Sequence, residues 1–293
     1  PTTPMATAAA TPAGHLRVGP AIDALIEALA ARAERDVASG EPAAARTAVM
    51  QANQLASRTA RADGPALRAL GERMGRAVAA EVERAAARFD RAAALDALES
   101  ARGMGLAESV LARLDARARA IPLPGERLGD GGVEMVLVQQ GGIRLGAMRR
   151  PVSRDEYAAF AEATGRAPAR CRERASVLRV LAPRSWTSPG FEQAGGDPVV
   201  CVSWEDASAY AQWRGQRDGH AYRLATSSEW PRLPGARGER AVSEWNIDCS
   251  GDCSQRVASG ASWRDEARQP AAREAERGYD DVGFRLVRDL EAD

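Results

Sequence analysis

The most specific chemistry available to this chain lies in its cysteines, which number four among 293 residues. They are Cys171, Cys201, Cys249 and Cys253. Their number is even, and no Cys or His cluster has the spacing of a zinc site. We therefore expect disulfides and an oxidising compartment, and Cys171 with Cys201 and Cys249 with Cys253 is one pairing that the sequence leaves open. The alternative is a cytosolic protein with four reduced, buried thiols.

The two histidines give little support for acid–base or nucleophilic catalysis. His15 stands alone at an expected helix start, and nothing near His220 suggests a general base. Three charged residues, Arg223, Glu229 and Arg285, lie at the ends or within expected helices and strands. We expect them to form buried ion pairs rather than to catalyse, and we expect no metal or other cofactor.

Aromatic residues divide the chain into two parts. Only Phe89 falls within residues 1–150, so thirteen of the fourteen Phe, Trp and Tyr follow it. Such a length can hold two domains. Basic and acidic residues balance at 40 each, which argues against nucleic acid as a partner. We expect a linker at 1–14, where the sequence continues a longer protein, a helical domain at 15–120, an interdomain linker at 121–132 and a second domain at 133–290.

The first domain reads as all-helical. Apolar residues recur at helical spacing, and Gly-Glu-Pro at 40–42, Asp-Gly-Pro at 63–65 and Gly-Met-Gly at 103–105 mark helix ends. These features predict four or five antiparallel helices. Their arrangement is either a bundle or a set of tetratricopeptide-like hairpins, although the repeat spacing departs from 34 residues.

The second domain mixes short strands with amphipathic helices, so the predicted class is α+β. Strands are expected at 133–138, 198–202 and 283–287. Ser153, Ser203 and Thr226 each precede an acidic residue by three positions, which predicts three capped helix starts. Trp204, Tyr210 and Trp213 follow the second of these starts. Rings at helical spacing are typical of a core, with a ligand cradle as the alternative.

Six segments in order resemble the formylglycine-generating enzymes, also called sulfatase-modifying factors, whose domain is a variant of the C-type-lectin fold. They are RPVSRDEYAAFAEATG at 150–165, DPVVCVSWEDASAYAQW at 197–213, YRLATSSEW at 222–230, SEW at 243–245, RVASGASW at 256–263 and GFRLVRD at 283–289. The resemblance covers nearly all of residues 131–290. It implies a fold in which loops around the last segments form the active-site region.

The departures from that family concern catalysis. Its enzymes carry a copper-binding cysteine pair after the motif that reads GASW here, but Asp265 and Pro270 stand at those positions. Neither residue can form the thiolate that binds a soft metal. Ala241 and Ser243 replace an Asn and a Trp of another motif, which puts the family's structural calcium in doubt. The chain is therefore expected to be a pseudoenzyme.

The resemblance also implies a biological setting, because such domains occur as extracytoplasmic parts of membrane-anchored bacterial signalling proteins, including Ser/Thr kinases. We expect a periplasmic or extracytoplasmic recognition module that senses a ligand or protein partner and meets the membrane only through a segment outside this chain. There are two alternatives. One is a divergent cysteine oxidase that uses Cys249 and Cys253, and the other is a structural assembly protein. Candidate ligand-surface residues are Arg264, Asp265, Arg268 and Tyr279.

Overall fold

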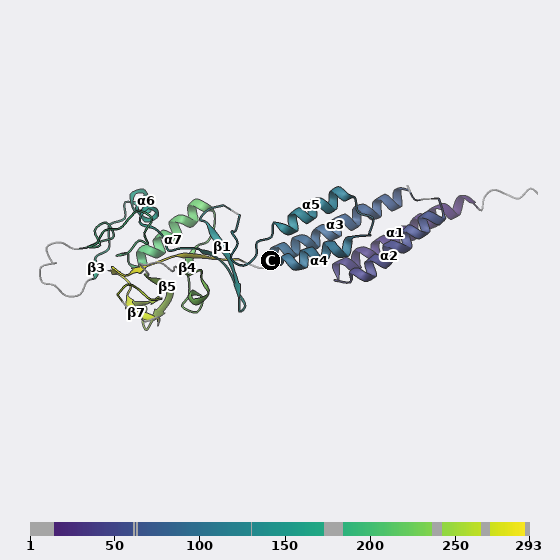
Figure 1. The fold of residues 1–293 in the computed structure, drawn as a ribbon. Helices are drawn as coiled ribbons and strands as arrows, with labels where there is room; N and C mark the ends of the chain where they lie inside the picture. Colours follow the sequence, from purple (N-terminus) through teal and green to yellow (C-terminus); the bar gives the residue numbers. More distant parts are fainter. Residues whose placement is uncertain are drawn as a thin grey trace, which may run out of the picture. The chain divides into compact units, whose positions relative to one another are not determined.

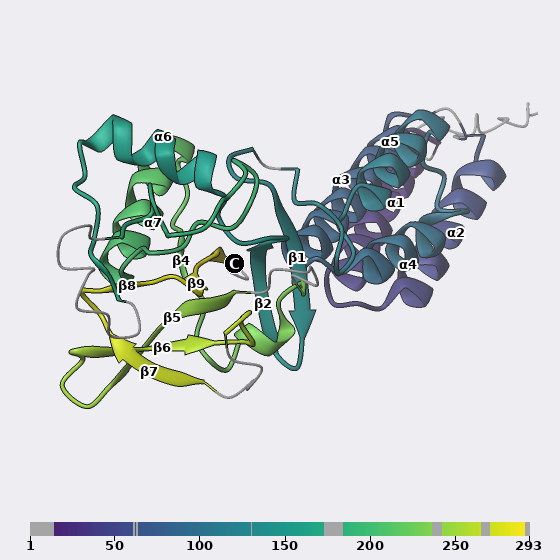
Figure 2. The ribbon, with the colours of Figure 1, turned by 60° about the vertical axis from the view of Figure 1, so that its left-hand side comes forward.

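The computed structural model describes residues 15–60, 62, 64–129, 131–172, 184–235, 242–264 and 270–290, except for the side chains of 15–18. The chain forms two compact units, of which the first ends at Pro122 and the second runs from Leu123 to Glu291. The linker expected at 1–14 and the residues Asp265 and Arg268 lie outside the described part. The α+β class is confirmed, with a helical first unit and a sheet-rich second unit (Figures 1 and 2).

The first unit consists of α-helices in which α1 packs against both α2 and α3, and α3 also packs against α4 (Figure 1). They are α1 His15–Ala38, α2 Pro42–Arg58, α3 Pro65–Ala87, α4 Arg91–Ala101 and α5 Glu108–Arg119. Pro42 and Pro65 begin their helices, where the missing N–H has no helical partner to lose. The core is built largely from alanine, with Ile26, Leu70 and Met74 among its larger side chains. Small side chains let these helices approach closely.

One helix boundary in this unit has no Gly or Pro signal. The chain turns between α3 and α4 at Phe89, whose φ of 54° is left-handed, and Asp90 then accepts a hydrogen bond from the Ala93 N–H at 2.9 Å. An Asp cap is a sufficient start signal for α4. The two units divide within the segment expected as a linker at 121–132, where Ile121 and Leu128 are buried among mostly exposed residues. Ile121 is buried among the helices, and Leu128 donates its N–H to the Met135 carbonyl at 2.9 Å in the second unit.

The second unit contains a mixed set of small sheets and two long helices (Figure 2). One sheet has the order β1-β2-β10-β4, another β7-β6-β5-β9, and β3 pairs with β8. The strands are β1 Met135–Gln140, β2 Ile143–Met148, β3 Cys171–Arg172, β4 Arg223–Leu224, β5 Ser243–Ser250, β6 Gln255–Ser259, β7 Ala271–Glu274, β8 Gly278–Tyr279, β9 Val282–Gly283 and β10 Leu286–Asp289. The helices are α6 Arg154–Thr164 and α7 Trp204–Asp218.

Two of the three predicted helix starts are confirmed. Ser153 and Ser203 each form a complete capping box at the start of α6 and α7. The third prediction is wrong in its outcome, because Thr226 and Glu229 make the box contacts but only the short 3-10 turn η3 Trp230–Arg232 follows. Pro234 explains the stop, since the residue before a proline is driven out of the helical region.

The expected strand at 198–202 is also wrong. This buried segment makes single hydrogen bonds, from Val199 N–H to Val152 O and from Cys201 N–H to Tyr279 O, both at 2.9 Å, but no ladder. Pro198 has no N–H to give, and Cys201 has a left-handed φ of 59°. The strand expected at 283–287 is divided between β9 and β10.

The aromatic residues of α6 and α7 build the core of this unit. Tyr157, Phe160, Tyr210 and Phe284 are all at most 2% exposed and meet at edge or stacked angles. Trp213 packs against Phe160 with ring centroids 5.4 Å apart but is only half-buried. Trp204 is half-buried as well, so the predicted core residues differ in how far they are enclosed.

Candidate ligand-binding site

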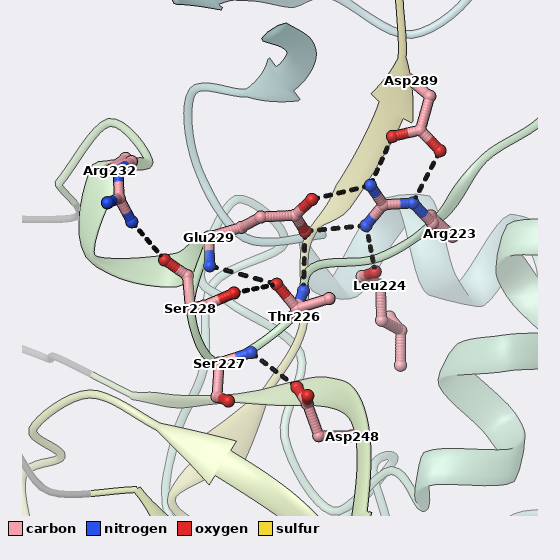
Figure 3. A network of polar contacts seen from close by, with 9 residues as sticks. All are labelled: Arg223, Leu224, Thr226, Ser227, Ser228, Glu229, Arg232, Asp248 and Asp289. Carbon is pink, nitrogen blue, oxygen red and sulfur yellow. Dashed lines mark hydrogen bonds and ion pairs between the residues drawn. The ribbon is translucent and has the colours of Figure 1, made fainter. Parts of the chain in front are cut away.

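The predicted charged residues form structural networks. The Arg223 guanidinium donates to both oxygens of Glu229 at 2.8 Å, to the Leu224 carbonyl at 3.1 Å and to the Asp289 carboxylate (Figure 3). These bonds join β4, the turn before η3 and the end of β10. Arg285 is 2% exposed and makes two bonds to the buried Glu244 carboxylate at 2.5 and 2.6 Å. The Arg285–Glu244 pair is a buried ion pair, as expected, whereas the Arg223–Glu229 pair is only half-buried.

The electrostatics of Glu229 follow from its partners. Burial raises the pKa of this carboxyl, but the hydrogen bonds from Arg223 and from the Thr226 N–H outweigh burial and hold the pKa below its usual value. The hydrogen bonds that Arg223 makes to Glu229 and to Asp289 raise the pKa of Arg223. Both groups are therefore charged and fully engaged at neutral pH, which leaves them no capacity for proton transfer.

Of the four residues expected at a ligand surface, the structure describes Arg264 and Tyr279. Tyr279 is 7% exposed, and its hydroxyl accepts a hydrogen bond from the Glu274 N–H at 3.0 Å. This burial corrects the expectation that Tyr279 faces a ligand, because its ring packs edge-on against Trp245. Arg264 is paired with Asp280. Its Nε donates to the Asp280 carboxylate at 2.7 Å, and its Nη2 donates to the second oxygen of the same carboxylate.

The adjacent Trp263 is exposed and yet fixed. Its indole is 46% exposed, while its Nε1 donates to the Asp280 carbonyl at 3.3 Å. The Arg264 guanidinium lies over the ring, 4.3 Å from its centroid, and the hydrogen bond to Asp280 raises the pKa of that guanidinium. Asp280 is itself 3% exposed. Asp280 thus orders both side chains, Trp263 through its main-chain carbonyl and Arg264 through its carboxylate, and Trp263 presents a preorganised aromatic surface.

Trp263 forms one wall of a cavity of about 530 Å³, which we call the Trp263 pocket. Phe191 forms a second wall, with its ring centroid 5.7 Å from that of Trp263 and the planes 75° apart. The other lining residues are Glu192, Gln193, Asp197, Pro198, Val200 and Val242. An apolar cavity with a few polar groups is the usual form of a small-ligand site.

The loop that carries Phe191 is held by the start of α6. Arg154 donates its backbone N–H to Asp197 O at 2.9 Å and its guanidinium to Gln193 O at 3.1 Å. The Asp155 N–H donates to Gly195 O at 3.0 Å, and a Cβ at Gly195 would meet the Asp155 carboxylate. A side chain at position 195 would therefore require the Asp155 carboxylate to move.

The inner side of the pocket rests on a disulfide. Val200, Cys201 and Val242 form a buried apolar cluster, against which Cys171 and Phe191 pack. Cys171 and Cys201 are bonded with an S–S distance of 2.09 Å. The bond therefore ties β3 to the segment that supplies Val200 to the pocket.

The sequence signals located only part of this pocket. Trp263 and Asp197 lie inside the motifs of the family resemblance, but Phe191, Glu192 and Gln193 belong to no motif and follow no apolar period. The cluster of turn-forming residues at 195–198 was the only local sign of a structured loop. The contact between Phe191 and Trp263, which lies some seventy positions later in the chain, depends on the fold.

All four cysteines are paired. Cys249, near the end of β5, and Cys253, in the turn that leads to β6, form the second disulfide. The two disulfides indicate an oxidising environment. No thiolate is available among them to hold copper, so the cysteines do not fit that ion. Within the described residues, no group of three or more His, Cys, Asp and Glu side chains is placed to hold a metal.

No helix in the described part of the chain has both the length and the apolar character required to cross a membrane.

Comparison with known proteins identifies the class of the second unit. Residues 144–241 match the sulfatase-modifying factor enzyme 1-like domain family, which confirms the resemblance drawn from the motifs. This part of the second unit is therefore similar to domains of the formylglycine-generating-enzyme type. No curated protein is significantly similar to the chain.

Three solved structures are similar to this chain. PvdO from Pseudomonas aeruginosa is 19% identical with a TM-score of 0.44, and the match covers 57% of this chain and 99% of PvdO. CarF is 17% identical with a TM-score of 0.35, covering 58% and 95%. Treponema denticola variable protein 1 is 14% identical with a TM-score of 0.37, covering 56% and 98%.

Proposed function

We propose that this chain is a non-catalytic recognition module that binds a ligand or protein partner in the Trp263 pocket. It acts as the periplasmic sensor region of a membrane-anchored bacterial signalling protein, such as a Ser/Thr kinase. The kinase and the membrane segment belong to sequence outside this chain.

The observation that carries this proposal is the fixed exposure of Trp263. Exposing 46% of an indole forgoes hydrophobic stabilisation, and the contacts with Asp280 and Arg264 hold the ring in that position. A rigid ring loses little conformational entropy when a ligand covers it. The neighbouring Phe191 and the cavity give the ring a concave setting in which a ligand is enclosed.

Residue identity supports a non-catalytic role. The family's enzymes oxidise a substrate cysteine with a thiolate pair, and Asp265 and Pro270 stand where those cysteines are expected. The chain's own cysteines are all in disulfides, two in the support of the pocket and two at the β5–β6 connection. In this proposal, the module has the family's type of domain and a cavity of ligand size, the Trp263 pocket, but lacks the thiolate nucleophile of the family's enzymes.

The signalling role rests on the disulfides and on the helical unit. Disulfide bonds suit a domain outside the cytoplasm, and packed helices such as α1 to α5 respond to small shifts in discrete steps. A purely structural assembly role would instead leave the pocket without consequence.

The test uses the full-length signalling protein. Trp263→Ala and a deletion of residues 131–293 are each compared with wild type for output under an inducing condition. The control is Ile247→Ala, which removes another exposed apolar side chain, 39% exposed, that does not line the pocket. We expect Trp263→Ala to abolish the response as the deletion does, and the control to respond normally. A normal response of Trp263→Ala and of the deletion would show that the structural role is correct.

A further inference from the structure

We propose that the Cys249–Cys253 disulfide is a thiol–disulfide exchange site, which a dithiol opens while the Cys171–Cys201 disulfide stays closed. The site lies at the turn between β5 and β6, and neither of its cysteines lines the Trp263 pocket. This inference goes beyond the proposed function and does not depend on it, because it concerns a covalent change of the chain itself.

The Cys249–Cys253 disulfide lies where another molecule can reach it. Cys249 is exposed and Cys253 is half-buried, and residues 250–252 and 254–255 around them are all exposed. A thiolate must reach a sulfur atom to attack it, and exposed disulfides are the ones that exchange readily. The turn between β5 and β6 therefore allows a thiolate, or the surface of a protein that carries one, to approach this bond.

The Cys171–Cys201 disulfide is enclosed instead. Cys201 is 0% exposed and belongs to the buried apolar cluster that supports the Trp263 pocket, against which the half-buried Cys171 packs. The N–H of Cys171 donates to Arg184 O at 3.0 Å. The N–H of Cys201 donates to Tyr279 O at 2.9 Å. Two thiols held side by side in this way react as if they were highly concentrated, so the bond between them resists opening.

The hairpin around Cys249 and Cys253 has contacts of its own. Strand β6 pairs with β5 on one side and with β7 on the other. In the turn, the Asp252 carboxylate accepts hydrogen bonds from the Ser254 N–H at 3.1 Å and from the Ser254 hydroxyl at 2.7 Å. None of these contacts uses a sulfur atom, so we expect the strands to stay paired when the bond opens. Opening is therefore a local change and leaves the domain folded.

The number of cysteines makes the exchange reversible. The chain has four cysteines, and Cys171 and Cys201 are bonded to each other. The thiols released at Cys249 and Cys253 therefore have no other partner in the same chain. In the bonded form their Cα atoms are 4.8 Å apart, within the usual range for a disulfide, and the paired strands keep them close. An oxidant therefore restores the same bond.

The exchange takes place in two steps. A thiolate of the dithiol attacks the exposed Cys249 sulfur to form a mixed disulfide, and the Cys253 sulfur leaves as a thiolate that takes up a proton from water. The second thiol of the dithiol then loses its proton, attacks the first sulfur of the dithiol and releases Cys249 as a thiol. The cysteine pair gains two electrons and two protons, and the dithiol loses the same number as it becomes a disulfide. Glutathione disulfide reverses the reaction.

The experiment treats the purified, folded chain with dithiothreitol, quenches samples over time with acid and blocks free thiols with N-ethylmaleimide before mass spectrometry of its peptides. We expect Cys249 and Cys253 to be labelled at least about tenfold faster than Cys171 and Cys201, because exchange depends on access to the sulfur. The control is the chain unfolded in urea, in which both pairs should be labelled at similar rates. Glutathione disulfide, added after dithiothreitol is removed, should restore the Cys249–Cys253 bond alone.

A variant and two natural kinds of thiol complete the test. The double variant Cys249→Ser with Cys253→Ser imitates the open form. Its near-ultraviolet circular dichroism and that of the selectively reduced wild type should match the spectrum of the oxidised wild type. Reduced glutathione and a protein dithiol of the Cys-x-x-Cys type, used in separate reactions, distinguish a small-molecule source of the thiol from a protein source.

Three results would overturn the proposal. The first is equal labelling of the two disulfides in the folded chain. The second is a Cys249–Cys253 bond that stays closed in the folded chain at a dithiothreitol concentration that opens it in urea. The third is loss of the near-ultraviolet spectrum on selective opening, which would show that the bond is needed for the fold. None of these results involves the Trp263 pocket, so the signalling test on Trp263→Ala decides the proposed function separately.

Discussion

At the scale of single residues, Trp245 and Trp263 are the extremes of exposure among the tryptophans of the second unit. Trp245 is 1% exposed and its Nε1 donates to Val202 O at 3.0 Å, whereas Trp263 is 46% exposed. We predict that Trp245→Ala lowers the free energy of unfolding by about 3–5 kcal/mol, as buried large-to-small changes do. Trp263→Ala should cost less than about 1 kcal/mol.

Urea denaturation of the two variants beside wild type measures this contrast. Equal losses would mean that Trp263 is a core residue, and the pocket would then lose its main argument. The half-buried Trp204 and Trp213 should fall between the two.

Glu229 supplies a prediction about pH. Its pKa in the folded protein lies below its ordinary value of 4.5, despite burial, because Arg223 and the Thr226 N–H stabilise the carboxylate. A carboxyl whose pKa is lowered by folding stabilises the fold when the pH is above its ordinary pKa. This stabilisation is lost as the pH falls through the pKa of the folded protein. Glu229→Gln should therefore be less stable than wild type at pH 7, and the difference should shrink below pH 4.5.

Denaturant unfolding between neutral and acidic pH measures that difference. Exposed Glu162→Gln serves as the control and should show a much smaller difference at every pH. A difference between Glu229→Gln and wild type that stays constant from neutral to acidic pH would contradict the ion-pair interpretation of Figure 3.

At the scale of elements, helix starts were the best-predicted features and strand ends the worst. The capping boxes at Ser153 and Ser203 are local contacts between residues three apart, so their pattern is complete in the sequence. Residues 198–202 have the apolar pattern of a buried strand, but they form a buried segment without a ladder of strand hydrogen bonds. Burial on its own favours apolar residues, and a strand additionally needs a neighbour whose hydrogen bonds are in register.

The two disulfides stabilise the fold by closing loops of different lengths. Cys171–Cys201 closes a separation of 30 residues and Cys249–Cys253 one of 4. In the chain-entropy description, we predict losses of about 4 kcal/mol for the double Cys→Ala variant of the first and about 2 kcal/mol for the second. Calorimetry on both variants tests the order of these losses. Unchanged melting, together with free thiols in unfolded wild-type protein, would indicate a reducing compartment instead.

At the scale of the whole molecule, residues 144–241 of the second unit are similar to a family of enzymes, and we infer that the positions for the family's chemistry differ. Pro270 cannot form a thiolate, and the four cysteines are in disulfides. We predict that the chain, given copper, a reductant, oxygen and a cysteine-containing sulfatase peptide, yields no formylglycine by mass spectrometry. A product whose formation disappears in Cys249→Ser would instead establish the divergent oxidase.

The sequence by itself determined the two-part composition, the class, the capped starts of α6 and α7 and the family resemblance. These depend on residue identity or on neighbours a few positions apart. Tertiary structure alone decided that Phe191 and Gln193 face Trp263, that Tyr279 is buried and that Arg285 meets Glu244. Such contacts join segments tens of residues apart, and no local pattern records which distant side chain a loop will meet once the core has packed.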